Sequence, residues 1–88
     1  MKYTIQFLKR AERDLAALPT AERARVLEAI TALSVQPHPP GVKALKGRLK
    51  GHFRIRVGPY RIIYQIQSEV LVVMIIRIGH RREVYRRR

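Results

Sequence analysis

The first residues of the chain alternate between apolar and polar side chains, and a helical spacing follows. Tyr3, Ile5 and Phe7 alternate with polar residues, which is typical of a short strand with one buried face. Apolar residues then recur at intervals of three and four positions and predict an amphipathic helix: Leu8, Ala11, Leu15 and Leu18. Pro19 should end that helix, because proline lacks the backbone N–H that a helix interior needs.

A second helix is expected directly afterwards. Thr20 is a suitable N-cap residue, and the predicted buried face of this helix combines Val26, Leu27, Ile30 and Leu33. The run of prolines between positions 37 and 40, followed by Gly41, should end helical structure. Since only a short break separates the two helices, they should pack as an antiparallel hairpin.

The second half of the chain has the alternation of strands. Strands are predicted over residues 53–57, 60–66 and 70–78, with the last run apolar enough to be covered on both faces or to lie centrally. The chain of 88 residues has the length of one domain. We therefore predict an α+β fold in the order β-α-α-β-β-β, with the helical hairpin packed on a mostly antiparallel four-stranded sheet.

Gly58-Pro59 is a turn signal between two of these strands and sets their expected register. A two-residue turn would place Arg56 opposite Arg61 and would bring Arg54 onto the same face. Like charges at paired positions destabilise a sheet. A phosphate would turn that repulsion into a clamp, because guanidinium groups bind phosphate through paired hydrogen bonds. The alternative is a solvated face whose arginine stems cover apolar surface.

Charge is distributed unevenly along the chain. The formal net charge is +13, and residues 43–88 contribute +11 of it, with thirteen Lys and Arg against Glu69 and Glu83. Such a one-sided field favours a polyanion, which could be nucleic acid, an anionic membrane or an acidic protein. The candidate RNA-binding side chains outside the hairpin are Lys43, Lys46, Arg48, Lys50, Arg77 and Arg82.

Several other kinds of chemistry are disfavoured by the residues present. There is no cysteine, the histidines lack zinc-site spacing, and all carboxylates other than Glu69 and Glu83 fall on the predicted helices. We therefore expect neither a metal nor another cofactor. The longest apolar run is too short to cross a bilayer, and the start of the chain has no signal-like apolar segment, so we expect a cytoplasmic protein without a membrane partner.

Two stretches of the basic half resemble the RelE toxins of the RelE/ParE superfamily. They are residues 43–64, with the sequence KALKGRLKGHFRIRVGPYRIIY, and residues 79–85, with the sequence GHRREVY; residues 15–18 before Pro19 also fit. The resemblance implies a compact α+β fold and neutralisation by a small antitoxin, which we expect to be acidic because of the charge of +11 on residues 43–88. It also implies cleavage of messenger RNA in the ribosomal A site by attack of a 2′-hydroxyl on the neighbouring phosphate, without a metal.

The same resemblance implies the site residues, and one departure leaves the general base open. The implied catalytic side chains are Arg54, Arg56, Arg61, Arg81 and Tyr85. The best-known members have lysines at the first two of these positions, and arginine is a poor base because it stays protonated. Tyr85 is one candidate base, if nearby arginines favour its ionised form, and His80 is another, because histidine titrates near neutral pH.

Two other functions remain open at this point. One is a ParE-like toxin on the same scaffold, which inhibits DNA gyrase and needs no RNA chemistry. The other is a basic module that binds the ribosome or RNA without cutting. The arginines and the tyrosine of the implied site favour the nuclease, because ParE-like chains generally lack that set.

Overall fold

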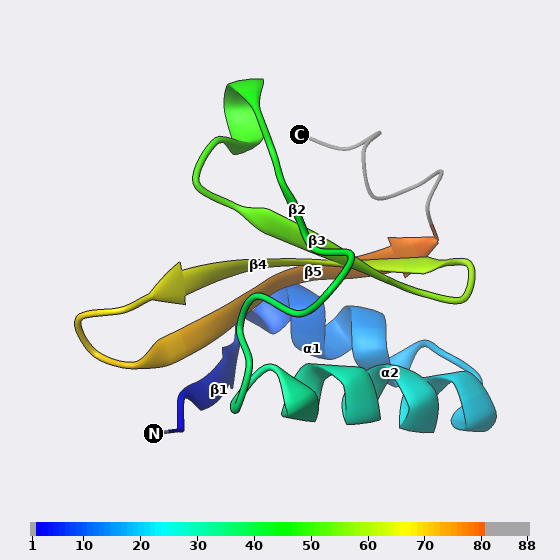
Figure 1. Cartoon of the computed structure of the whole chain (residues 1–88). Helices are drawn as coiled ribbons and strands as arrows, with labels where there is room; N and C mark the ends of the chain where they lie inside the picture. The colour runs from blue at the N-terminus through cyan, green and yellow to red at the C-terminus, as the bar shows by residue number, and fades with distance from the viewer. Residues whose placement is uncertain (1, 81–88) are drawn as a thin grey trace.

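The computed structural model describes residues 2–80, which form two helices and a five-stranded sheet. The elements are β1 (Thr4–Phe7), α1 (Lys9–Ala16), α2 (Thr20–Ala32), β2 (Lys43–Ala44), a short 3₁₀ helix η1 (Gly47–Leu49), β3 (Phe53–Val57), β4 (Tyr60–Gln67) and β5 (Val72–His80). Both helices lie on one side of the sheet (Figure 1). The α+β class and the packing of the helical hairpin on the sheet are confirmed.

The strand order is β1-β5-β4-β3-β2, so β5 lies between β1 and β4. Strands β2 to β5 pair antiparallel, whereas β1 pairs parallel to β5, with Thr4 beside Val72 and Phe7 beside Ile75. Of the two alternatives predicted for the last apolar run, the one confirmed is a place inside the sheet, with a strand on each side. The sheet has five strands rather than the predicted four. The additional strand, β2, has only two residues, which are too few to show alternation in the sequence.

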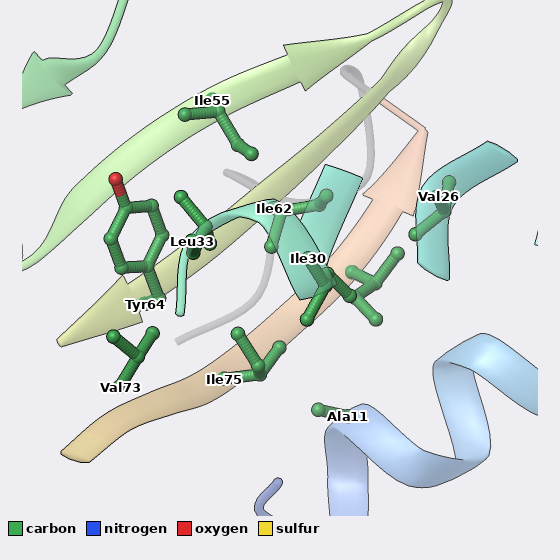
Figure 2. Close-up of a cluster of buried hydrophobic side chains, with 10 residues drawn as sticks. Ala11, Val26, Ile30, Leu33, Ile55, Ile62, Tyr64, Val73 and Ile75 are labelled. Atoms are coloured by element: carbon green, nitrogen blue, oxygen red, sulfur yellow. The ribbon is translucent and has the colours of Figure 1, made fainter. Parts of the chain in front are cut away.

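The core fills the space between the sheet and the helices (Figure 2). Its buried members from the helices and the C-cap of α2 are Ala11, Val26, Ile30 and Leu33, and those from the sheet are Ile55, Ile62, Tyr64, Val73, Ile75 and Ile78. The predicted burial of Leu27 is wrong, because 43% of this residue is exposed on the outer side of α2. Thr20 is the first residue of α2 rather than its cap, and Pro19 occupies the N-cap position.

A buried hydrogen bond attaches the proline-rich segment after α2 to the sheet. The hydroxyl of Tyr64 donates to the carbonyl oxygen of Pro37 at 2.7 Å, and Tyr64 is fully buried. Burial raises the pKa of Tyr64 to about 12, because an ionised phenolate would lose its hydration in the core. This contact fixes the path of the chain from α2 towards β2.

One extra residue interrupts the pairing of β4 with β5. Ile63 pairs with Arg77, but Tyr64 pairs with Ile75, so Ile76 is a bulge on β5. The bulge changes which residues face the helices, since Val73 and Ile75 precede it on that face and Ile78 follows it. In residues 2–80, no helix combines the length and the apolar character that crossing a membrane would require.

Candidate functional site

The face of the sheet away from the helices carries a cluster of cations. Arg56 pairs with Arg61 across β3 and β4, and Arg54 lies two residues from Arg56 on the same face. Lys43 on β2 is the cross-strand partner of Arg54. We call Arg54, Arg56 and Arg61 the arginine patch. The predicted register of this hairpin is confirmed at every pair.

The turn between β3 and β4 explains why this register holds. Gly58 has a φ of +60°, a conformation that strains other residues, and it occupies the first central position of a two-residue turn. The ring of Pro59 fixes its own φ near about −65°, which suits the second position of a type II′ turn. Such turns match the twist of the strands that they join, so Arg56 and Arg61 are held directly opposite each other.

The arginine patch is partly embedded in its face of the sheet. Arg56 is exposed, whereas Arg54 and Arg61 are half-buried and their Nε atoms are shielded from solvent. Ile63, which pairs with Arg54 on this face, is buried although no helix in residues 2–80 covers it. Guanidinium groups that are partly held by their surroundings lose less freedom when they bind an anion.

His80 lies on the other face of the sheet, away from the arginine patch. It pairs with Tyr60, and the two rings meet edge to face with their centroids 6.2 Å apart. Tyr60 packs against the core on the helix side. His80 also lines a pocket of about 340 Å³ together with Asp14 and Leu18 from the α1 region. The sequence predicts that His80 lies beside the arginines, but the structure places it on the opposite face of the sheet.

Arg77, a predicted RNA-binding residue, is held by a carboxylate of α1. Its Nε lies 3.3 Å from Oδ2 of Asp14, and the backbone N–H of Ile78 donates to the same oxygen at 2.9 Å. Arg10 contacts the other carboxylate oxygen at 3.3 Å. Asp14 therefore caps the edge of β5 beyond the end of β1, and it gives Arg77 a structural role.

Three of the predicted RNA-binding residues are exposed in the loop that connects β2 to β3. Lys46, Arg48 and Lys50 belong to a segment that contains η1 and projects from the sheet on the side away from the helices (Figure 1). Leu49 in this segment is only half-exposed. The β2–β3 loop thus presents three cations on the same side of the sheet as the arginine patch.

A groove that the sequence analysis did not predict lies between α2 and β3. It has a volume of about 450 Å³, its apolar wall includes Ala29, Ala32 and Leu33, and Lys43, Arg54 and Arg56 also line it. No sequence signal indicates it, because it forms where β2 ends and leaves the rest of β3 unpaired on that side. The remaining candidates Arg81, Arg82 and Tyr85 lie outside the described residues.

The carboxylates and histidines of residues 2–80 are scattered over the fold. No three of them come together as a group that could hold a metal ion.

Comparisons with known proteins agree over nearly the whole chain. The family model of the ParE toxin of the type II toxin–antitoxin system parDE matches residues 5–85. Toxin RelG of Mycobacterium tuberculosis is 43% identical over 88 residues, which covers 99% of this chain and 100% of that protein.

Solved structures give the same result. The toxin–antitoxin complex RelBE2 of Mycobacterium tuberculosis contains a chain with a TM-score of 0.82 at 40% identity, covering 91% of this chain and 99% of that one. The archaeal RelE–RelB complex of Pyrococcus horikoshii gives 0.80 at 30% identity, covering 94% and 99%. These matches show that the chain belongs to the RelE/ParE superfamily of type II toxin–antitoxin systems, as a RelE-family toxin.

Proposed function

We propose that the chain is a ribosome-dependent endoribonuclease that cuts messenger RNA in the A site and thereby inhibits translation. The observation that carries the proposal is Arg56 directly opposite Arg61, with Arg54 beside them on a face that no helix of residues 2–80 covers. Like charges in this arrangement cost the sheet stability. An RNA phosphate bound between them would turn that cost into binding energy.

The proposed reaction is a transfer within the RNA backbone. The 2′-oxygen attacks the neighbouring phosphorus, the bond from phosphorus to the 5′-oxygen breaks, and the products are a 2′,3′-cyclic phosphate and a 5′-hydroxyl. A base removes the proton of the 2′-hydroxyl, and the departing 5′-oxygen gains a proton. Negative charge grows on the non-bridging oxygens during attack, and the guanidinium groups of the arginine patch would stabilise it there.

Tyr85 is the better of the two candidate bases. A base must come within hydrogen-bond reach of the 2′-hydroxyl, and His80 faces the helix side of the sheet beside Tyr60. On this proposal Arg81 assists charge stabilisation near the leaving oxygen. A pH–rate profile distinguishes the candidates, because Tyr85→Phe should remove its rising limb and His80→Gln should leave it; the opposite result would return the role to His80.

The ribosome supplies what this small site lacks. A patch of three arginines cannot by itself hold a flexible messenger bent for in-line attack, and positioning of that kind is worth roughly 7–11 kcal/mol in well-oriented systems. Contacts to ribosomal or messenger phosphates would come from the exposed cations of the β2–β3 loop, Lys46, Arg48 and Lys50. Arg82 would add a further contact of this kind. This mode of action implies a cytoplasmic location.

The expected protein partner is a small acidic antitoxin. The related structures from Mycobacterium tuberculosis and Pyrococcus horikoshii are complexes of a toxin with its antitoxin. The groove between α2 and β3 combines an apolar wall with Lys43, Arg54 and Arg56. An acidic segment with apolar side chains would fit both properties, and it would block the arginine patch.

The test is cleavage of a messenger on a stalled ribosome, mapped by primer extension. Wild type should cut within the A-site codon, and Arg61→Ala should cut at least about 100-fold more slowly, as when other transition-state donors are removed. Arg13→Ala, which removes an equal charge from the exposed side of α1, should cut at the wild-type rate. Single-turnover cleavage by Arg61→Ala at wild-type speed would refute the proposed role of the patch.

A ParE-like action on DNA gyrase is the alternative, because the chain also matches the family model of ParE toxins. The two functions separate in one comparison. A gyrase poison would leave the messenger intact and stabilise DNA breaks made by gyrase, whereas the proposed nuclease would leave gyrase unaffected.

A further inference from the structure

The open face of the sheet, which is the face away from the helices, carries uncharged polar and apolar side chains beyond the arginine patch. Gln65 on β4 pairs with Met74 on β5, and Met74 pairs with Gln6 on β1. These three residues form a row across neighbouring strands, which we call the amide row. The face therefore has a cationic part near the β3–β4 turn and an uncharged part further along β4 and β5.

The amide row lies on the same face as the arginine patch. The neighbours of Met74 along β5, Val73 and Ile75, belong to the core on the helix side, so Met74 points the other way. Gln65 shares that face with Ile63 and Arg61, because positions two and four apart on β4 have the same orientation. At about 3.4 Å per residue, the amide row lies roughly 14 Å from Arg61 and 7 Å from Ile63 along the strand.

The side chains of the amide row are available for a ligand. Gln6 is exposed, and Gln65 and Met74 are half-exposed. Over the described residues 2–80, neither glutamine side chain makes a hydrogen bond within the protein. An amide offers both a donor and an acceptor, so these groups can pair with a ligand that offers the same combination.

Nucleotide bases are the ligand that this combination fits. Single-stranded RNA exposes base edges, and glutamine can contact an adenine edge through two hydrogen bonds. The flexible, polarisable thioether of Met74 suits contact with an aromatic ring. A phosphate would instead prefer the cations nearby.

We propose that the amide row of Gln6, Gln65 and Met74 receives the base of a nucleotide close to the scissile phosphate and sets the sequence preference of cleavage. The inference rests on the proposed nuclease function and adds a division of labour to it. The arginine patch binds the backbone at any sequence, and the amide row distinguishes one base from another.

The first experiment measures cleavage preference on ribosomes that carry different A-site codons. Gln65→Leu should reduce the ratio between the best and the worst base at one codon position by about tenfold, the effect of one lost bidentate base contact. Gln67→Leu is the matched control, because Gln67 is exposed and pairs with Val72 outside the amide row, and it should keep the wild-type preference. A Gln65→Leu protein that cuts with unchanged preference would overturn the inference while leaving the nuclease function intact.

A second measurement does not depend on cleavage. In NMR spectra of the labelled protein, the side-chain amide signals of Gln65 and Gln6 should shift on addition of 2′-O-methyl RNA trinucleotides, which lack the attacking hydroxyl. The size of the shift should depend on the base, and inorganic phosphate should not reproduce it. If the shifts depend on the base but the wild-type protein cuts no messenger, the amide row binds bases and the proposed nuclease function is refuted. Signals that do not move would refute the amide row.

Discussion

The two faces of the sheet are built from the same strands but serve opposite purposes. The face towards the helices presents isoleucine, valine and tyrosine side chains that are buried in the core. The open face presents Arg54, Arg56 and Arg61, and further along it Gln65 and Met74. One face lowers the free energy of the fold, whereas the other contains a like-charged pair that raises it. This contrast supports the proposal that the open face binds a ligand.

The sharpest test of the contrast uses adjacent residues on β4. Ile62 is fully buried on the helix side, so Ile62→Ala should lower the free energy of unfolding by about 2–5 kcal/mol, through lost burial and the cavity left behind. Urea denaturation would measure the change. Arg61→Ala is the companion variant, and its unfolding free energy should change far less. Equal losses in both variants would show that the open face also stabilises the fold.

Asp14 connects α1 to the edge of β5, and its removal should have the next largest effect. Asp14→Ala leaves the N–H of Ile78 and the guanidinium of Arg77 without this carboxylate, which should cost about 1–3 kcal/mol. Thermal denaturation would detect it as a lower Tm. Asp14→Asn keeps an oxygen acceptor and should lose less. A Tm of Asp14→Ala equal to that of wild type would mean that the edge of β5 needs no cap.

Tyr64 should show a smaller effect that depends on pH. Tyr64→Phe removes the hydrogen bond to Pro37 and should cost about 1 kcal/mol at neutral pH. Because burial raises the pKa of Tyr64 to about 12, its neutral form is favoured in the folded state. That stabilisation is fully present below pH 10, near the ordinary tyrosine value, and is lost as the pH rises towards 12.

Denaturation at neutral pH and at high pH would measure this dependence for both proteins. The difference in stability between wild type and Tyr64→Phe should shrink as the pH rises from 10 towards 12. A difference that stays constant over this range would mean that ionisation of Tyr64 is not coupled to unfolding.

The smallest expected effect has the opposite sign. Arg56→Thr removes one member of the like-charged pair with Arg61 and should raise the free energy of unfolding by about 0.2–1 kcal/mol. The gain should shrink at high salt, which screens exposed charges. Arg56→Lys keeps the charge and should show no gain. Lower stability of Arg56→Thr at low salt would mean that Arg56 contributes packing that outweighs the repulsion.

The hairpin and the helices could be predicted because their signals are local. Gly58-Pro59 determines the register of Arg56 and Arg61 within a few residues of chain, and the spacing of Val26 and Ile30 determines the inner face of α2. Leu27 was misplaced because an apolar residue adjacent to a buried stripe can also lie outside it. The sequence carries no information on which neighbouring element would cover that side.

The position of His80 could not be predicted, because it depends on the bulge at Ile76. With strict alternation from Val73 and Ile75, His80 would point to the open face beside the arginine patch. The extra residue shifts the alternation by one, so Ile78 enters the core and His80 pairs with Tyr60 on the helix side. A bulge is set by pairing with a distant strand, and the local pattern of β5 does not show it.

The central place of β5 also affects how the protein can fold as it is synthesised. This strand is the last of the described elements along the chain, yet it pairs with both β1 and β4 and contributes Val73, Ile75 and Ile78 to the core. The β3–β4 hairpin can form early, because its contacts are local. The sheet cannot close before residues 72–80 are free to insert, and contacts between distant residues are slow to form. A nascent chain still tethered to the ribosome would therefore carry its arginines without the rigid support that arranges them.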